Sequence, residues 1–333
     1  MSSDHIRLAS LSQNFLNLIL MPTEACNFRC TYCYETFEHK KMRPSVVRGI
    51  KTLLDRRSPD LEGLSIDWFG GEPLLAMDVI NSVSQHAIGL ARQHGFQFSA
   101  KMTTNGYFLS TERFSECLRN GIDHFQISFD GDKTLHDASR KLIQGAGTFD
   151  QLWSNVINLK AMQGEFSILL RLHFTRENYR AVADFGRKVR DALGEDSRFQ
   201  YHFKGIGRWG GQNDDQISII PRDQIGEILS YLWERSGLPR VEAESGYPVC
   251  YAGMANSLVI RSTGHLAKCT VALSDDFNSV GTIAENGELT VDQRKFRKWI
   301  APLVEQRWED AGCPLSVVAR ESLAETAKSA SLM

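Results

Sequence analysis

Apolar and polar positions along the chain alternate between short strand-like runs and longer helix-like patterns. A short apolar run at 15–20 precedes a helical pattern at 44–56 that begins with proline. The same order recurs at 64–69 and 74–94, 96–102 and 111–119, 124–129 and 149–162, 166–174 and 179–193, and 199–206 and 225–235. Six strand–helix units in one direction predict a parallel sheet that curls into a barrel, left open because six units are fewer than eight.

The pattern changes near residue 237. Short extended pieces follow at 255–261, 266–270, 281–283 and 287–290, and a helix is expected at 293–299. We therefore expect an α/β fold, with a partial (β/α)6 barrel over residues 1–236 and a small α+β domain over residues 237–333. No internal repeat or low-complexity tract interrupts either part.

Three cysteines, Cys26, Cys30 and Cys33, lie within eight residues directly after the first predicted strand. Active sites of α/β barrels gather at this end of the strands. Thiolates in so short a loop converge on zinc or on an iron–sulfur cluster, and such sites usually take a fourth Cys or His from nearby. No fourth cysteine occurs before Cys117, and the nearest histidine is His39. We expect a cubane cluster with three protein ligands and one open iron; a three-cysteine zinc site and scattered reduced thiols are the alternatives.

Composition and charge narrow the class of protein. The chain has 333 residues, of which 42% are hydrophobic and 23% charged, as in ordinary globular proteins. A net charge of −2 gives no reason to expect nucleic acid or an anionic membrane as a partner. The chain has no recognisable export signal or spanning apolar run, and its seven cysteines are an odd number. These features predict a reduced, cytoplasmic protein without a disulfide framework.

The C-x3-C-x2-C spacing, with an aromatic residue before the third cysteine, resembles the signature of the radical SAM superfamily. The resemblance implies that the open iron of a [4Fe-4S] cluster chelates S-adenosylmethionine (SAM), whose reductive cleavage gives a 5′-deoxyadenosyl radical. It implies that Tyr32 packs on the adenine. It also implies that Gly70, Gly71 and Glu72, after the second predicted strand, hydrogen-bond the SAM amino group. An ordinary strand-to-helix turn is the alternative for that glycine pair.

Polar residues also end later predicted strands. By the same resemblance Asn105, Ser128 and Asp130 are expected to contact the ribose or carboxylate of SAM, and Arg140 to pair with the carboxylate. Arg171, inside an otherwise apolar strand, is a further candidate for cofactor binding. Each of these could instead form a turn or a cap, or, for Arg171, pair with a buried carboxylate. Their recurrence at successive strand ends favours a shared site.

A second set of cysteines, Cys250, Cys269 and Cys313, lies in the C-terminal part. It resembles the SPASM or twitch extension of radical SAM enzymes, in which a hairpin and a short helix hold an auxiliary iron–sulfur cluster. The match is incomplete, because a twitch domain uses four cysteines and a SPASM domain seven. We expect a three-cysteine auxiliary cluster; a distant or non-cysteine fourth ligand and loss of the cluster are the alternatives. Cys117, at an apolar helix position, is expected to be a buried small hydrophobe.

The segment 204–215 contains four glycines, Arg208, Trp209, Asp214 and Asp215. A glycine-rich loop at the barrel edge is a natural place for substrate contact, and a flexible linker is the alternative. Either Asp214 or Asp215 is a candidate general base for a proton lost during an oxidation. The sequence does not choose between the two.

The resemblance covers nearly the whole chain and implies a peptide maturase. Its substrate would be a ribosomal precursor peptide, its electron donor a flavodoxin or ferredoxin, and its product an oxidative carbon–carbon crosslink, with a cyclophane as the preferred form. An auxiliary cluster favours net oxidation, because oxidation needs an electron acceptor. The alternatives are a dehydrogenase of a small alcohol, a sulfatase-maturing enzyme, or a non-catalytic iron–sulfur electron carrier.

Overall fold

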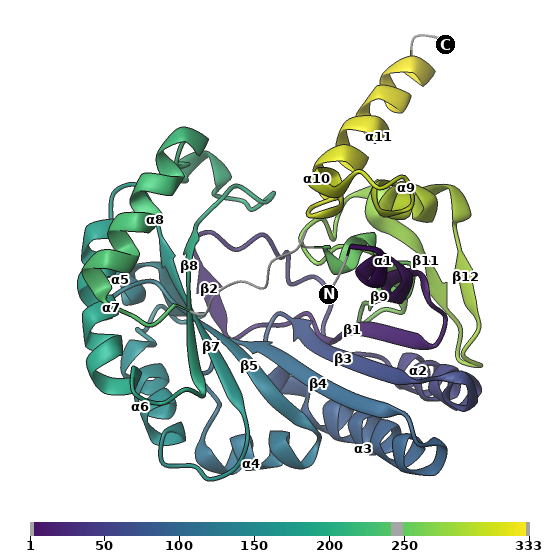
Figure 1. Cartoon of the computed structure of the whole chain (residues 1–333), viewed down its shortest axis with the longest axis horizontal. Coiled ribbons are helices and arrows are strands. Elements are labelled where there is room, and N and C mark those ends of the chain that lie inside the picture. The colour runs from purple at the N-terminus through teal and green to yellow at the C-terminus, as the bar shows by residue number, and fades with distance from the viewer. Residues whose placement is uncertain (1–2, 241–248, 331–333) are drawn as a thin grey trace.

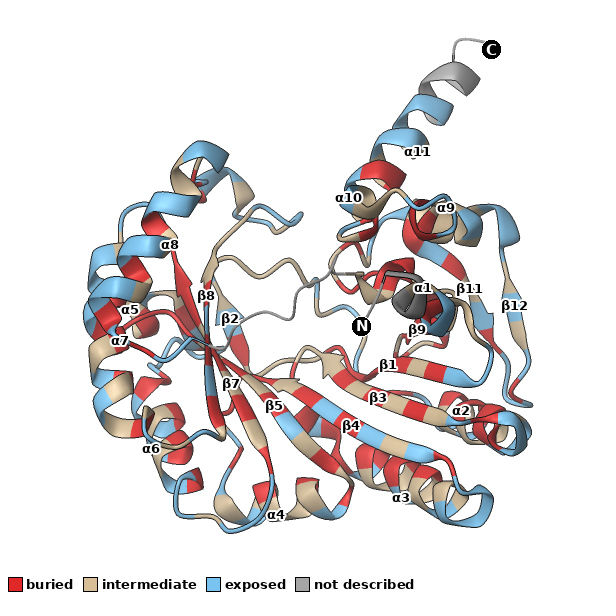
Figure 2. Ribbon diagram, in the orientation of Figure 1, coloured by how far each residue is buried: buried red, intermediate tan, exposed pale blue. Residues whose placement is uncertain are grey.

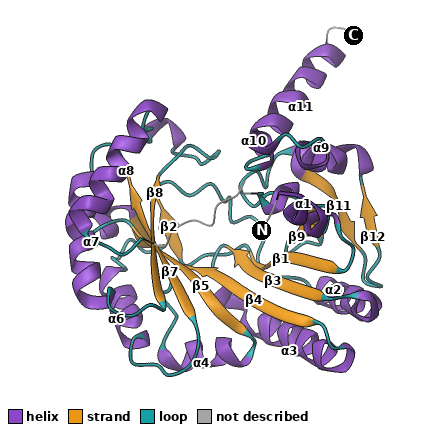
Figure 3. Cartoon of the chain, in the orientation of Figure 1, coloured by secondary structure: helices purple, strands orange, loops and turns teal. Residues whose placement is uncertain are grey.

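The computed structural model describes residues 3–240 and 249–330. The strands of this part of the chain form one large sheet and one small sheet (Figures 1 and 3). The large sheet contains β1 (Phe15–Thr23), β3 (Gly63–Gly70), β4 (Gln97–Thr104), β5 (Ile122–Phe129), β7 (Ser167–Phe174), β8 (Phe199–Gly205), β9 (Ser257–Ile260), β10 (His265–Ala267), β11 (Ser279–Ile283) and β12 (Leu289–Val291). The small sheet pairs β2 (Phe28–Cys30) with β6 (Arg140–Leu142).

The large sheet runs in the order β12-β11-β10-β9-β1-β3-β4-β5-β7-β8. Its last six strands are all parallel to their neighbours. They are the six strands expected from the sequence, and they curl into the predicted partial barrel (Figure 1). The mixed α/β fold with an open barrel is therefore confirmed.

Helices cover the outer face of the curled sheet (Figure 3). They are α2 (Pro44–Arg57), α3 (Met77–His94), α4 (Thr111–Arg119), α5 (Lys133–Ser139), α6 (Phe149–Leu159), α7 (Tyr179–Leu193) and α8 (Arg222–Ser236). Outside the barrel units lie α1 (Ser3–Leu11), α9 (Gln293–Val304), α10 (Trp308–Ala311) and α11 (Leu315–Ala330). The sequence pattern did not predict α1, α5, α10 or α11. The helix expected at 149–162 ends earlier, the one expected at 293–299 continues further, and the stretch 74–94 begins with a separate 3-10 turn at Pro73–Ala76.

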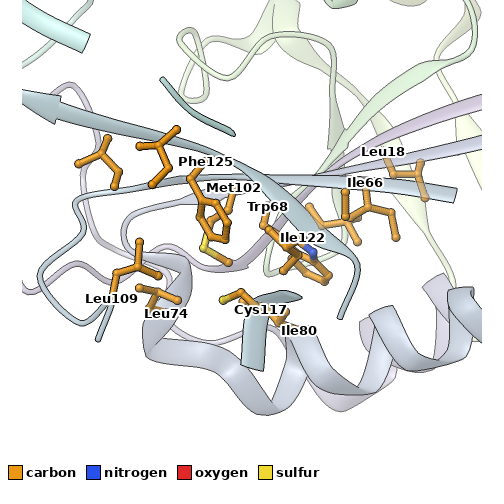
Figure 4. Packing of buried hydrophobic residues seen from close by; sticks show 14 of the residues in the cluster. Leu18, Ile66, Trp68, Leu74, Ile80, Met102, Leu109, Cys117, Ile122 and Phe125 are labelled. Atoms are coloured by element: carbon orange, nitrogen blue, oxygen red, sulfur yellow. The ribbon is translucent and has the colours of Figure 1, made fainter. Parts of the chain in front are cut away.

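The two faces of the barrel sheet differ in burial, and this difference explains the sequence pattern (Figure 2). In β3 the residues Leu64, Ile66 and Trp68 are buried, whereas the residues between them remain partly exposed. The buried face packs against the helices in one apolar core, part of which is drawn in Figure 4. Cys117 lies in this core with no exposed surface, as expected for a small hydrophobe. On β3 to β8 the other face is mostly polar and partly exposed, whereas at β1 and β9 Ile19, Met21 and Val259 form a second, small buried cluster on it.

The C-terminal strands continue the barrel sheet. Strand β9 lies parallel to β1, in a register that sets Asn17 beside Ser257 and Leu20 beside Ile260. Strands β10, β11 and β12 follow in antiparallel order. The expected hairpin is thus β9–β10, and it lies beside the strand that precedes the first cysteine loop. The domain boundary near residue 237 stays a prediction.

Candidate active site

The first cysteine loop follows β1 and forms part of the wall of a cavity of about 210 Å³. Cys26, Cys30 and Cys33 all line this cavity and are only partly exposed. Burial raises the pKa of all three thiols, that of Cys33 to about 12. A bare thiolate would therefore be unfavourable here at neutral pH, and a bound metal group would supply the positive charge that stabilises it.

These residues fit a cluster of several metal atoms. Within residues 3–240 and 249–330, no three His, Cys, Asp or Glu side chains lie close enough together to hold a single metal ion. The three thiols instead border one shared cavity, so a cluster lying in it could reach each of them through a different metal atom. The buried Nε atom of Arg140 and that of Arg171, both lining residues of this cavity, have no hydrogen-bond partner within the described chain. Each of these atoms could donate to an anionic ligand.

The glycine pair at the end of β3 allows the strand to approach the cysteine loop closely. A Cβ on Gly70, whose φ is +119°, would lie 2.2 Å from the carbonyl oxygen of Thr23. A Cβ on Gly71 would lie 2.4 Å from the carbonyl oxygen of Ala25. Both glycines line the cavity. Only glycine fits at either position, because the neighbouring atoms belong to the backbone and cannot turn away.

Glu72 is not among the residues that line the cavity. Its fully buried carboxylate accepts hydrogen bonds from the Thr104 hydroxyl, at 2.7 Å, and from the backbone N–H groups of Leu74 and Asn105, at 3.0 and 2.7 Å. Burial raises the pKa of this carboxyl group. Glu72 thus ties the end of β3 to the end of β4. In the sequence reasoning the whole Gly-Gly-Glu segment is a SAM contact, and the structure places only its two glycines on the cavity wall.

Three buried side chains and the partly exposed Tyr32 form a network behind the cysteines. The Arg140 Nη1 donates to the Tyr32 hydroxyl at 2.8 Å, and that hydroxyl donates to Asp130 Oδ1 at 2.8 Å. His173 Nδ1 lies 3.1 Å from the same hydroxyl and 3.3 Å from Asp130. A hydrogen bond from His173 and the charge of Arg140 hold the pKa of Asp130 well below its usual range, against the effect of burial. The network fixes Tyr32 and Arg140 at the cavity wall.

The remaining predicted SAM contacts divide into two groups. Asn105, Ser128 and Arg171 line the cavity together with Tyr32 and Arg140. The Asn105 amide nitrogen donates to Asn27 at 2.8 Å and lies 3.7 Å from the Cys26 sulfur, which joins β4 to the cysteine loop. Asp130 lies behind the wall, where it holds its neighbours.

Sequence reasoning missed several lining residues, among them His173, Lys204, Tyr34 and Glu35. His173 lies two residues after Arg171 on β7, so the period of two along a strand could have indicated that both face the same side. Glu35, two residues after Cys33, is only partly exposed, and burial followed by the charge of Glu24 raises its pKa to about 8. No motif in the sequence points to this carboxylate.

The second cysteine set is assembled from three separate segments. Cys250 precedes β9, Cys269 follows β10, and Cys313 precedes α11. The three segments meet, because the backbone N–H of Cys250 donates to the carbonyl of Ala311 at 3.0 Å and the Tyr251 hydroxyl lies 2.7 Å from that of Thr270. Cys313 is exposed and lines a larger cavity of about 1000 Å³. Beside this set lies Lys268, which is almost fully buried and donates to the backbone carbonyls of Met254 and Ser257, at 2.6 Å each.

The two predicted base candidates lie away from the first cavity. Asp214 accepts a hydrogen bond from the backbone N–H of Gly210 at 2.7 Å, so that it closes its own loop. Asp215 is exposed, and neither aspartate is a lining residue of this cavity. Trp209 of the same loop does line it, and it also lines the larger cavity beside Cys313. Other residues of the loop line one cavity or the other, so the loop borders both, and Trp209 lines both. The role of Asp214 or Asp215 stays a prediction.

A buried ion pair joins the two cysteine regions. Glu24 Oε2 lies 2.5 Å from Nη2 of Arg261, at the end of β9. The other carboxylate oxygen of Glu24 accepts from the hydroxyl of Ser262 at 2.7 Å and from its N–H at 3.2 Å. Arg261 in turn donates to the carbonyl of Leu273 at 2.7 Å, in the segment that follows Cys269. The loop that carries the first cysteines is thus fixed to the hairpin that carries the second set.

Comparison with known proteins identifies the class of protein that this fold and site define. A family model of the radical SAM superfamily matches residues 20–186, half of the chain. The chain belongs to the radical SAM superfamily. Within the superfamily it resembles the SPASM-domain peptide maturases.

Among curated relatives, the PqqA peptide cyclase of Gluconobacter oxydans is 25% identical over 214 residues, which cover 64% of this chain and 55% of that protein. The chain thus spans about half the length of that relative. The structure of native anSMEcpe with bound AdoMet and Kp18Cys peptide has a TM-score of 0.63 at 20% identity, covering 86% of this chain and 81% of that chain. Streptococcus suis SuiB bound to precursor peptide SuiA has a TM-score of 0.58 at 13% identity, covering 91% and 68%.

Proposed function

We propose that this protein is a peptide-modifying enzyme that makes an oxidative, intramolecular carbon–carbon crosslink in a ribosomal precursor peptide. The observation that carries the proposal is the arrangement of the first cavity. Three thiols, a glycine pair and an arginine held by a buried network surround one space. The name of the cyclase relative and the descriptions of both structural neighbours mention a peptide. A cyclophane, in which an aromatic ring is joined to a neighbouring Cβ, is the specific product we propose.

Each group on the wall has a separate task in this proposal. Cys26, Cys30 and Cys33 would hold a [4Fe-4S] cluster, and Arg140 would hold the carboxylate of SAM. The backbone of Gly70 and Gly71 would hold the amino group, and Tyr32, Asn105 and Ser128 would contact the adenosine. When bound, the cluster and SAM together supply a 5′-deoxyadenosyl radical that removes a hydrogen atom from the substrate. The network of Tyr32, Asp130 and His173 keeps the arginine fixed, so that little reorganisation is needed when SAM binds.

The second cysteine set supports the oxidative form of the reaction. A crosslinked product has two hydrogen atoms fewer than the peptide, so an electron acceptor is required. Cys250, Cys269 and Cys313 offer ligands for one, an auxiliary iron–sulfur cluster. Asp214 or Asp215 is the proposed base for the proton that leaves with the electron. A flavodoxin or ferredoxin in the cytoplasm is the proposed donor of the electron that starts the reaction. No helix in the described part of the chain is long and apolar enough to cross a membrane.

The direct test is mass spectrometry of candidate peptides after incubation with the reconstituted full-length protein, SAM and a reductant. We expect a peptide encoded beside this gene to lose two hydrogen atoms, and 5′-deoxyadenosine to form. Turnover of a small alcohol or of a sulfatase peptide, with no change in any neighbouring peptide, would overturn the crosslinking proposal. Absence of 5′-deoxyadenosine under strongly reducing conditions would indicate an electron carrier instead.

A further inference from the structure

Two cationic side chains on the wall of the first cavity have no acidic side chain paired with them in the described part of the chain. Arg171 lies on β7 and Lys204 on β8, and both line the cavity. We call these two residues the cationic wall. The strands are parallel, and the register sets Arg171 beside His202 and His173 beside Lys204. Residues 171, 173, 202 and 204 therefore face the same side of the sheet, and the cationic wall occupies a diagonal on the inner face of the barrel.

Within residues 3–240 and 249–330, neither cation has a hydrogen bond or an ion pair with another side chain, and the Nε of Arg171 is buried without a partner. The nearby acid Asp130 is already engaged by Tyr32, Ser139 and His173. Burial, and then the charge of Arg171, lowers the pKa of Lys204. Burial likewise lowers the pKa of Arg171. A half-buried cation without a partner costs free energy that an anionic ligand would recover.

SAM does not supply enough negative charge to balance this wall. Its sulfonium and ammonium groups are positive and it has one carboxylate, so its net charge is +1. That single carboxylate is assigned to Arg140, which is already fixed beside the cysteine loop by Tyr32. The cationic wall lies on β7 and β8, at the opposite end of the barrel sheet from β1 and β3. The negative charge of thiolate-bound clusters would stay at the two cysteine sets, so the substrate is the component expected to bring an anion to this wall.

We propose that Arg171 and Lys204 bind a carboxylate group of the peptide substrate, on an Asp or Glu side chain near the modified residue or at the peptide C-terminus. This inference rests on the proposed function, because it takes the substrate to be a peptide. The fork of Arg171 suits bidentate binding of a carboxylate, and Lys204 adds a point charge beside it. The substrate is thereby defined as a peptide with an acidic group at a fixed distance from the reacting carbon.

The test is equilibrium binding of three fluorescent peptide pools to the full-length protein, reconstituted with its cluster and saturated with SAM. All pools are random at other positions but lack Asp and Glu there. One has central Glu and an amidated end, the second central Gln and an amidated end, and the third central Gln and a free C-terminal carboxylate. We expect either the first or the third pool to bind about tenfold tighter than the second. Equal affinity for all three pools would overturn the proposal.

Variants assign the effect to the wall. Lys204→Met and Arg171→Met should each reduce the preference to about twofold or less, and the affinity of Lys204→Met for SAM should be unchanged. The matched control is Arg187→Gln on the outer helix α7, where a surface ion pair with Asp184 is lost and the preference should remain. Near-ultraviolet circular dichroism and iron content verify folding. Loss of SAM affinity in Arg171→Met would show that Arg171 binds the cofactor and not the peptide. An unchanged preference for carboxylate peptides in Lys204→Met would overturn the role of Lys204.

The outcome is separable from that of the proposed function. Formation of 5′-deoxyadenosine without any peptide measures the SAM chemistry alone. A binding preference for carboxylate peptides without any two-hydrogen loss would overturn the crosslinking proposal and support carboxylate binding by the cationic wall. A two-hydrogen loss at an unchanged rate from a peptide that lacks any carboxylate would overturn carboxylate binding by the cationic wall and support the crosslinking proposal.

Discussion

The two cysteine sets differ in how the chain builds them. Cys26, Cys30 and Cys33 lie in one loop at the carboxyl end of β1 and line one small cavity. The second set comes from segments on both sides of a hairpin and from the start of α11, up to 63 residues apart in sequence. The first set is backed by the network of Arg140, Tyr32, Asp130 and His173. Among the described residues beside the second set, Lys268 instead donates to backbone carbonyls.

The difference indicates separate tasks. Three cysteines in one loop, with a fixed arginine beside them, are suited to hold a cluster and a small charged ligand side by side. A set assembled from three segments depends on the fold for its geometry and lies next to a larger cavity of about 1000 Å³. Glu24 and Arg261 join the two sets, so that each can influence the stability of the other. Five measurements would sharpen this comparison or break it.

Removal of one thiol from each set should have the largest effect. Cys30→Ala should abolish formation of 5′-deoxyadenosine, because a cluster with two remaining ligands is not held. Cys313→Ala should leave this formation within about threefold of the wild type, because the second set is not needed to bind SAM. Liquid chromatography of 5′-deoxyadenosine, with iron counted per chain, measures both. Loss of the product in both variants would show that the two sets do not act separately.

Arg140 is expected to dominate the affinity for SAM. Arg140→Met should weaken SAM binding by about 100-fold, because a charge-assisted pair is lost and the Tyr32 hydroxyl loses its donor. Tyr32→Phe should weaken it less, by about tenfold, because the guanidinium remains. Isothermal titration with SAM measures the dissociation constants. A weaker effect of Arg140→Met than of Tyr32→Phe would contradict the assignment of the carboxylate to this arginine.

The buried ion pair between the two regions is expected to be the main joint between them. Glu24→Gln should lower the free energy of unfolding by about 4 kcal/mol, because Arg261 is left buried without its charge partner. Denaturant unfolding gives this value. Arg48→Gln, which removes an exposed pair with Glu285, is the control and should change stability by about 1 kcal/mol or less. Equal losses in the two variants would mean that the regions are held together by other contacts.

Acid should destabilise the barrel behind the first set through His136. Burial lowers the pKa of His136 from 6.5 to about 4, so the folded chain keeps it neutral while the unfolded chain protonates it. Stability from this group is complete above pH 6.5 and is lost as the pH falls from 6.5 to 4, by about 3 kcal/mol. Unfolding free energies of wild type and His136→Gln between pH 4 and 7 test this. Parallel pH curves for the two proteins would contradict it.

The smallest effect is expected outside both sets. Cys117→Ala should cost about 1 kcal/mol, because one buried sulfur atom is removed from the core shown in Figure 4. Iron content and formation of 5′-deoxyadenosine should stay at the wild-type level. A drop in iron would make Cys117 a ligand and would supply the fourth thiolate missing from the second set.

Local patterns in the sequence predicted most of the barrel. The alternation of buried and more exposed positions made β3, β7 and β8 predictable as strands, because an open barrel exposes one face of each strand. Two of the helices missed in the sequence, α5 and α10, are only seven and four residues long, too short for a helical period to repeat. The first cysteine loop and the glycine pair were also predictable, because their ligands and close approaches lie within a few residues of each other in the chain.

The sequence by itself thus determined the order of strands and helices, the first cysteine set and the glycine pair beside it. Only the tertiary structure decided how distant segments meet. The pairing of β9 with β1 brings Arg261 to Glu24, across 237 residues, and gathers the second cysteine set. The register of β7 with β8 brings Arg171 and Lys204 to one wall. Such contacts depend on which strands become neighbours, and that choice is made by packing of the whole sheet, which no short sequence pattern encodes.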